Sequence, residues 1–169
     1  MIAIYPGSFD PFTNGHLNVL SHASDIFDKV YLVVMRHPDK KRFIDVFTTA
    51  DLIRQSIPAY LDNVEVLVAE SDLIYKEAKR LRCDYIVRGV RNNGLDYSYE
   101  ENLAEFNKDI GNINTIFIRA DVNKNVSSTM IRTLFANGES ISNYVPGEIN
   151  RYLKENKNDY WNYRQIRCR

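Results

Sequence analysis

Short apolar runs alternate with helix-period segments along most of this chain, and this alternation is the feature that most constrains its fold. Apolar residues on consecutive positions predict strands that are covered on both faces. The runs lie at residues 2–5, 30–35, 64–69, 85–87 and 114–118. Alternating strands and helices predict a parallel sheet with right-handed crossovers.

The segments between these runs carry a helical period. Helices are predicted over residues 15–27, 49–61, 72–81, 97–109, 127–136 and 146–155. Gly111 and Gly138 stand where helices are expected to end. We therefore expect one α/β domain over 1–155, a single Rossmann-like, doubly wound, five-stranded parallel sheet with helices on both faces and a C-terminal helical extension, followed by a polar and aromatic tail over 156–169.

Charge and length exclude several classes of protein. The 169 residues include 22 Lys and Arg and 22 Asp and Glu, so the formal net charge is zero. Because nucleic-acid and membrane-surface binders usually carry a basic excess, neither kind of partner is expected. No apolar run approaches the roughly 18 residues of a membrane helix. Cys83 and Cys168 fit no metal or redox spacing, which indicates free thiols and a cytoplasmic location.

The segment over 5–16, Tyr-Pro-Gly-Ser-Phe-Asp-Pro-Phe-Thr-Asn-Gly-His, has the outline of a phosphate site. It follows the first apolar run and leads into a helix. Gly15 lets the backbone approach a ligand closely, and the first helical turn offers unpaired N–H groups. His16 stands where its imidazole can reach an oxygen held at this turn.

Two further polar segments are expected at the same edge of the sheet. Ligands of open α/β sheets bind beyond the carboxyl ends of the strands, where the strand order reverses. In a doubly wound sheet of this length, the reversal falls between the first and fourth strands. The loop at 88–91 follows the fourth strand, and the helix start at 126–132 follows the fifth.

Each of these segments also has a structural interpretation. Hydroxyl and acidic residues commonly cap helices and turns, and basic runs are commonly solvated loops. These interpretations apply to Asp10, Thr13, 40–42, Arg88, Arg91 and 127–129. Taken alone, the turn at 13–16 is about as consistent with a helix cap as with a ligand site.

Taken together, the segments favour phosphoryl or nucleotidyl transfer. Such reactions need alignment of the reactants and positive groups around the transferring phosphate more than covalent chemistry from the protein. His16, Lys40, Arg88 and Arg91 supply such groups. No nucleophile stands beside a base, so the attacking group is expected on a second substrate. The motifs of P-loop proteins, dinucleotide-binding folds and protein-bound metals are absent from the sequence.

These residues resemble the nucleotidyltransferase superfamily with a (His/Thr)-x-Gly-His motif. Within it, residues 5–16 and Val-Arg-Gly-Val-Arg at 87–91, followed by Asp-Tyr-Ser-Tyr-Glu at 96–100, resemble the phosphopantetheine adenylyltransferase family. The resemblance implies transfer of AMP from ATP to 4′-phosphopantetheine, which gives dephospho-coenzyme A and pyrophosphate in coenzyme A synthesis. It also implies Mg²⁺ bound with ATP and no dedicated protein cage for a metal, feedback by coenzyme A, and a homohexamer.

The resemblance assigns roles position by position. His16 is the catalytic residue that stabilises the transition state. The residues assigned to ATP are Ser8, Phe9, His16, Gly89, Val90, Arg91, Glu100, Asn123, Lys124, Asn125, Val126, Ser127, Ser128 and Thr129. The residues assigned to the acceptor are Ser8, Lys40, Ile74 and Arg88.

The chain departs from the family pattern at 123–126, where an aromatic residue is usual, and one residue is added between Arg91 and Tyr99. Its C-terminal third also resembles nicotinate mononucleotide adenylyltransferase, so a sister enzyme is one alternative. A nucleotide or coenzyme A sensor without turnover is a second, and a scaffolding module without ATP binding is a third.

Overall fold

The computed structural model describes residues 1–36, 41–90, 94–121 and 126–157. Its centre is a five-stranded sheet in the order β3-β2-β1-β4-β5, and every neighbouring pair is parallel. The strands are β1 (Ile2–Gly7), β2 (Lys29–Val34), β3 (Val64–Val68), β4 (Tyr85–Val90) and β5 (Asn114–Arg119). The predicted fold is confirmed, and the strand order reverses between β1 and β4 as the sequence predicted.

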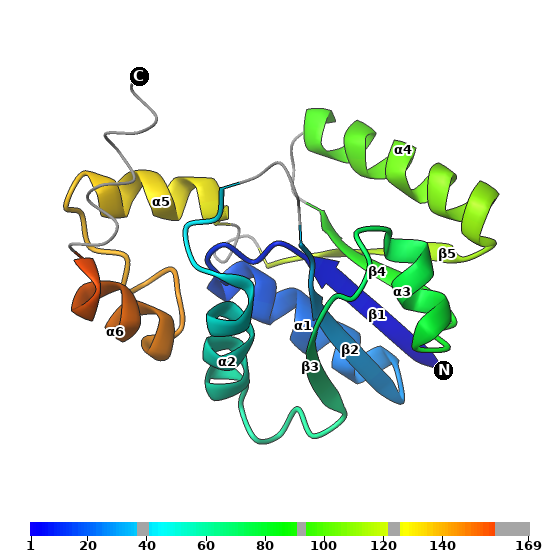
Figure 1. Ribbon diagram of the computed structural model, residues 1–169, viewed down its shortest axis with the longest axis horizontal. Helices are drawn as coiled ribbons and strands as arrows, with labels where there is room; N and C mark the ends of the chain where they lie inside the picture. The colour runs from blue at the N-terminus through cyan, green and yellow to red at the C-terminus, as the bar shows by residue number, and fades with distance from the viewer. Residues whose placement is uncertain (37–40, 91–93, 122–125, 158–169) are drawn as a thin grey trace.

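Helices connect the strands and extend the C-terminal part of the fold (Figure 1). Those within the described residues are α1 (Asn14–Ile26), α2 (Val46–Ser56), α3 (Ile74–Arg80), α4 (Gly94–Gly111), α5 (Ser128–Ala136) and α6 (Gly147–Glu155). Helix α6 lies beside α2, and α5 contributes Ile131 and Phe135 to the same core cluster, so both helices extend the layer on one face of the sheet.

Alternating side chains of β1 divide the interior into two clusters. Ala3 and Tyr5 belong to the larger cluster, which contains the buried residues of α1, α2, α5 and α6. Ile4 points the other way, into a smaller cluster to which α3 contributes Ala78. Each cluster fills the space between one face of the sheet and its helices. Period-two alternation of buried side chains therefore accounts for helices on both faces.

Local capping explains where the structure differs from the predicted boundaries. The second helix begins at Val46, three residues before the predicted start, because the Asp45 carboxylate accepts the amides of Phe47 and Thr48. Gly111 was predicted as a cap but is the last residue of α4. The left-handed residue is Asn112, with φ of +51°.

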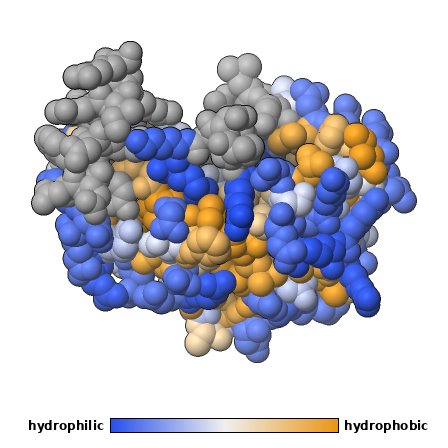
Figure 2. All heavy atoms as spheres, in the orientation of Figure 1, coloured by the Kyte–Doolittle hydropathy of each residue, from blue (hydrophilic) through white to orange (hydrophobic). Residues whose placement is uncertain are grey.

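The carboxyl end of β1 lies at the point where a site was expected. The loop that leaves Gly7 runs between α5 and the body of the sheet before it enters α1 (Figure 1). No helix among the described residues is long and apolar enough to span a bilayer. Apolar atoms gather over α4 in the space-filling view, and Phe106 and Ile110 of that helix are exposed (Figure 2).

Candidate active site

The loop between β1 and α1 has an unusual conformation that its aromatic side chains stabilise. Phe9 has a φ of +48°, a left-handed value that is rare for a bulky residue. Its ring is buried, and it meets the rings of Tyr5 and Phe12 edge-on at centroid distances of 5.3 and 5.6 Å. A Cβ atom on Gly7 would lie 2.7 Å from the Phe9 ring. Glycine at position 7 is therefore needed for this ring to fold back over the loop.

Thr13 begins α1 with a reciprocal cap. Its hydroxyl accepts the amide of His16 at 3.3 Å, and its own amide donates to Nδ1 of His16 at 3.0 Å. The same hydroxyl donates to the carbonyl of Val126 at 3.2 Å. The predicted helix cap at Thr13 is thus present, and it also fixes the imidazole.

The cap determines which nitrogen of His16 carries a hydrogen. Because Nδ1 accepts the amide of Thr13, the hydrogen of the neutral ring is assigned to Nε2. The ring stacks on Phe12 at 5.6 Å and meets the edge of Phe9 at 5.2 Å. Packing and hydrogen bonding therefore hold a ring N–H donor in one orientation.

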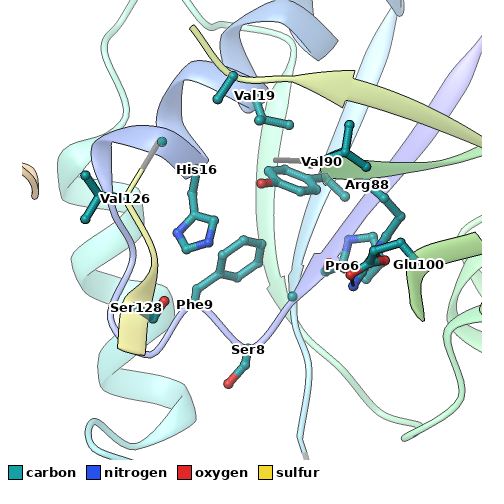
Figure 3. Close-up of a pocket in the computed structure, with 15 residues that line it drawn as sticks. Pro6, Ser8, Phe9, His16, Val19, Arg88, Val90, Glu100, Val126 and Ser128 are labelled. Atoms are coloured by element: carbon teal, nitrogen blue, oxygen red, sulfur yellow. Dashed lines mark hydrogen bonds and ion pairs between the residues drawn. The ribbon is translucent and has the colours of Figure 1, made fainter. Parts of the chain in front are cut away.

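His16 lines a cavity of about 210 Å³ at the carboxyl ends of β1 and β4. Figure 3 shows the imidazole beside Phe9, with Arg88 and Glu100 on the other side of the Phe9 ring. All three segments that the sequence singled out contribute to the other walls, and their small polar or glycine positions are Gly7, Ser8, Gly15, Gly89 and Ser128. The predicted convergence of three distant segments is therefore found.

Arg88 contacts a carboxylate rather than solvent. Its Nε and Nη2 donate to the two oxygens of Glu100 at 2.6 Å each, and its Nη1 donates to the carbonyl of Pro6 at 2.9 Å. The two side chains are only 20% and 16% exposed. The sequence assigned these residues to different substrates, whereas the structure joins them in one ion pair within the cavity wall.

Gly89 and Val90 also line the cavity, as predicted. A Cβ atom on Gly89 would lie 3.1 Å from Val19 and 3.5 Å from the hydroxyl of Tyr5. This close approach of β4 to α1 requires a small residue.

The three hydroxyl residues at 127–129 make different contacts. Ser127 is the N-cap of α5, since its hydroxyl accepts the amide of Met130 at 3.0 Å. Ser128 lines the cavity and donates to the carbonyl of Pro11 at 2.8 Å. Thr129 is exposed, and its hydroxyl accepts from Arg132. Only Ser128 of the three therefore lines the cavity wall, together with the preceding Val126.

One more predicted residue within the described part of the chain lies away from the cavity wall. Ile74 is half-buried and packs on the smaller core cluster. Five further candidates lie outside the described residues: Lys40, Arg91, Asn123, Lys124 and Asn125.

Arg42 is the most informative residue that the sequence interpretation missed. The prediction of a solvated basic loop at 40–42 is wrong for this side chain, which is half-buried beside Ser8. Burial lowers the pKa of its guanidinium below the usual value, and the nearby carboxylates of Asp10 and Asp45 oppose that shift. No local pattern signals this contact, because Ser8 lies 34 residues away in the sequence.

Asp10 also joins the loop after β1 to the stretch of chain before α2. Its buried carboxylate accepts the amides of Phe43 and Ile44 at 2.8 Å each. The interpretation of Asp10 as a cap of its own turn is therefore wrong. Its carboxylate binds the backbone that leads into α2, and it fixes the position of the loop containing Ser8.

Asn18 of α1 holds the end of β5 through a two-way contact. Its side-chain oxygen accepts the amide of Asp121 at 2.8 Å, and its side-chain nitrogen donates to the Asp121 carboxylate at 2.9 Å. The hydroxyl of Thr13 holds Val126 on the far side of the segment 122–125. Helix α1 and its cap thus anchor both ends of that segment.

A second cavity, of about 480 Å³, lies on another side of α1. Asparagine, serine, tyrosine and aliphatic side chains line it, and none of its lining residues in the described part of the chain is charged. A phosphate group needs charged or strongly polar donors. The smaller cavity around His16 and Arg88 is therefore the better candidate for a phosphorylated ligand.

Comparison with known proteins identifies the family. The cytidylyltransferase-like family model matches residues 4–134. The phosphopantetheine adenylyltransferase of Streptococcus gordonii is 34% identical over 155 residues, which cover 90% of this chain and 93% of that one. The enzyme of the same name from Streptococcus equi subsp. zooepidemicus is 37% identical over 161 residues, with 94% and 96% coverage. The chain belongs to the phosphopantetheine adenylyltransferase family.

Solved structures agree with this assignment at the level of the fold. The nicotinic acid mononucleotide adenylyltransferase of Plasmodium falciparum aligns with a TM-score of 0.64 at 17% identity, covering 94% of this chain and 96% of that one. The lipopolysaccharide core biosynthesis protein of Thermoplasma volcanium aligns with a TM-score of 0.51 at 20% identity, covering 72% and 96%. The predicted family resemblance is thus confirmed, and the chain adopts a nucleotidyltransferase fold.

Proposed function

We propose that this member of the phosphopantetheine adenylyltransferase family transfers AMP from ATP to 4′-phosphopantetheine in the cytoplasm. The products are dephospho-coenzyme A and pyrophosphate. The observation that carries the proposal is 34–37% identity to curated enzymes of that name over 90–94% of the chain. The orientation of the His16 ring in the cavity supports it independently, because the cap at Thr13 presents an N–H donor where a phosphate can bind.

The reaction needs no proton transfer from the protein. An oxygen of the acceptor phosphate attacks the α-phosphorus of ATP, a new O–P bond forms, and the bond to the β-phosphate breaks as pyrophosphate takes the electron pair. Alignment of these groups can supply about 7–11 kcal/mol of the barrier. His16 donates from Nε2 to a non-bridging oxygen of the α-phosphate, where negative charge accumulates.

The other assigned residues hold the two substrates. On the ATP side these are Ser8, Phe9, Gly89, Val90, Arg91, Glu100 and 123–129, and on the acceptor side Ser8, Lys40, Ile74 and Arg88. The ion pair of Arg88 and Glu100 supports a role for these two residues at one common place in the site. A ligand that binds either residue must compete with the other residue or bind to both.

Mg²⁺ would be supplied to this site with ATP. Among the described residues that line the cavity, Glu100 is the carboxylate, and both of its oxygens accept from Arg88. Among the described residues, no group of three His, Cys, Asp or Glu side chains could hold a metal ion. We propose that substrate phosphates and water hold the ion, as is usual for Mg²⁺.

The assembly and its regulation belong to the same proposal. We infer a homohexamer that binds coenzyme A as a feedback ligand. The exposed Phe106 and Ile110 on α4 support burial of that helix between subunits, because apolar side chains grouped on a surface commonly mark interfaces. Light scattering after size exclusion should give six times the chain mass of 19.7 kDa.

The acceptor test decides the proposed function. Wild-type protein is incubated with ATP, Mg²⁺ and one acceptor at a time: 4′-phosphopantetheine, nicotinate mononucleotide or a polyol phosphate. We expect pyrophosphate release with 4′-phosphopantetheine alone. Release only with nicotinate mononucleotide would assign the chain to the sister activity. Binding of ATP without release in any arm would favour a nucleotide sensor.

A further inference from the structure

Arg42 contacts Ser8 twice through the edge of its guanidinium that carries Nη1 and Nη2. Nη2 donates to the Ser8 carbonyl at 2.8 Å, and Nη1 donates to the Ser8 hydroxyl at 3.1 Å. The rest of the group is anchored at the start of α2, where Nε donates to the carbonyl of Ile44 at 2.8 Å and Nη2 to the hydroxyl of Thr49 at 3.2 Å. Because all three nitrogens of this planar group donate hydrogen bonds, its orientation is fixed.

This contact sets the role of the Ser8 hydroxyl. A guanidinium can only donate, so Ser8 Oγ must be the acceptor in this bond. The hydroxyl hydrogen of Ser8 is then directed to a different acceptor. Ser8 is exposed at the wall of the cavity, and a phosphate oxygen is a strong acceptor for such a hydrogen. A positive charge behind the hydroxyl also strengthens the bond that the hydroxyl donates.

Arg42 and Arg88 both contact the end of β1 or the loop after it, but they differ in their other partners. Arg88 donates to both oxygens of Glu100, so a carboxylate already occupies one edge of its fork. The hydrogen bonds of Arg42 within the described part of the chain go to neutral oxygens, and the carboxylates of Asp10 and Asp45 lie near it without a bond to it in that part. Arg42 therefore acts on the Ser8 hydroxyl with a charge that no bonded carboxylate offsets there.

We propose that Arg42 is a positioning residue for the phosphate monoester of the acceptor, and that it acts by fixing Ser8 as a hydroxyl donor. This inference rests on the proposed function, since it takes the acceptor phosphate as the group that Ser8 meets. It adds to that function a residue two positions beyond Lys40, on the stretch of chain that Asp10 clamps to the loop.

The test measures binding of two ligands that differ only in the phosphate. Calorimetry gives the Kd of 4′-phosphopantetheine and of pantetheine for wild type, Arg42→Gln and Arg42→Lys. We expect Arg42→Gln to weaken 4′-phosphopantetheine about 10- to 100-fold, the range for a charge-assisted hydrogen bond, and to change pantetheine less than threefold. Arg42→Lys should restore little of this loss, because an ammonium cannot reproduce the fork.

A double-mutant cycle separates the positioning role from a merely structural one. In a Ser8→Ala background, Arg42→Gln should weaken 4′-phosphopantetheine by less than threefold, because the hydroxyl through which it acts is gone. Arg54→Gln is the matched control, since Arg54 on the following helix α2 also donates to a carbonyl, that of Val66. It should leave both affinities unchanged. Thermal unfolding of each variant reports any loss of the fold.

The outcomes distinguish this inference from the proposed function. Wild-type protein without turnover of 4′-phosphopantetheine would overturn the proposed function and the role of Arg42 with it. Normal wild-type turnover with an unchanged Kd in Arg42→Gln would overturn the Arg42 role alone. An equal penalty for 4′-phosphopantetheine and pantetheine, or an equal penalty with and without the Ser8 hydroxyl, would also overturn it.

Discussion

Replacing Thr13 by Val should damage both stability and turnover, because the hydroxyl caps α1 and contacts the His16 ring. Thr13 is fully buried, and valine keeps its shape. The loss of an N-cap costs about 1 kcal/mol, and the lost bond to the Val126 carbonyl adds about 0.5–1.5 kcal/mol. The sum, about 1.5–2.5 kcal/mol, corresponds to a Tm lower by about 3–10 °C for a domain of this size.

The effect on turnover should be smaller than the loss of the imidazole itself. The amide of Thr13 still donates to Nδ1 of His16, so the ring keeps its tautomer. The hydroxyl gives its hydrogen to the Val126 carbonyl and Nδ1 carries none, so their 3.1 Å approach is a packing contact and not a further hydrogen bond. Loss of the cap and of the Val126 bond loosens the start of α1, and about 1 kcal/mol of lost positioning predicts a kcat lower by about 3- to 10-fold.

Calorimetric unfolding and pyrophosphate release measure the two effects. Thr13→Ser is the matched control, since it keeps the hydroxyl and should stay close to wild type in kcat. The reasoning would be refuted if Thr13→Val kept both its Tm and its kcat. It would also be refuted if Thr13→Ser lost as much activity as Thr13→Val.

Three further predictions follow from other contacts. Asp10→Ala should lower the free energy of unfolding by about 2–6 kcal/mol, since it leaves two buried amides at 43–44 without an acceptor; denaturant titration showing under 1 kcal/mol would contradict this. Glu100→Gln should tighten binding of 4′-phosphopantetheine without ATP about 3- to 10-fold, because the phosphate no longer competes with a carboxylate for Arg88; weaker binding would refute it. Burial, with the charge of Asp84, raises the pKa of Cys83 to about 12 from 9.0, so the stability from burying the neutral thiol is present below pH 9 and lost as the pH rises towards 12. Wild type should therefore lose stability more steeply than Cys83→Ala over that range, and parallel curves would contradict the shift.

Period and composition were enough to predict the sheet and the edge where the site lies. Strands that are apolar on consecutive positions are expected between two layers of helices, and the usual order of a doubly wound sheet then puts the reversal beside β1. Gly138 was also predicted correctly, because its φ of +80° suits glycine. The start of α2 was predicted too late, although Asp45 directly before the apolar Val46 and Phe47 is a recognisable cap signal.

Local sequence patterns could not predict the contacts between distant segments. Arg42 and Ser8 are 34 residues apart, and Asn18 and Asp121 are 103 apart, so their pairing depends on how β1, α1 and the start of α2 pack. Arg88 and Glu100 lie 12 residues apart, yet their pairing follows only from the placement of α4 above β4. Sequence patterns thus located the cavity, while long-range packing determined which polar groups in it are paired.

The role of His16 is the central claim, and His16→Ala tests it most directly. We expect ATP to bind with a Kd within about threefold of wild type, since the transition state makes greater use of this donor than the ground state does. The kcat for 4′-phosphopantetheine should fall at least 100-fold, by analogy with the loss of about 10²–10³ on removal of one preorganised donor. A kcat within tenfold of wild type, with binding unchanged, would contradict the account.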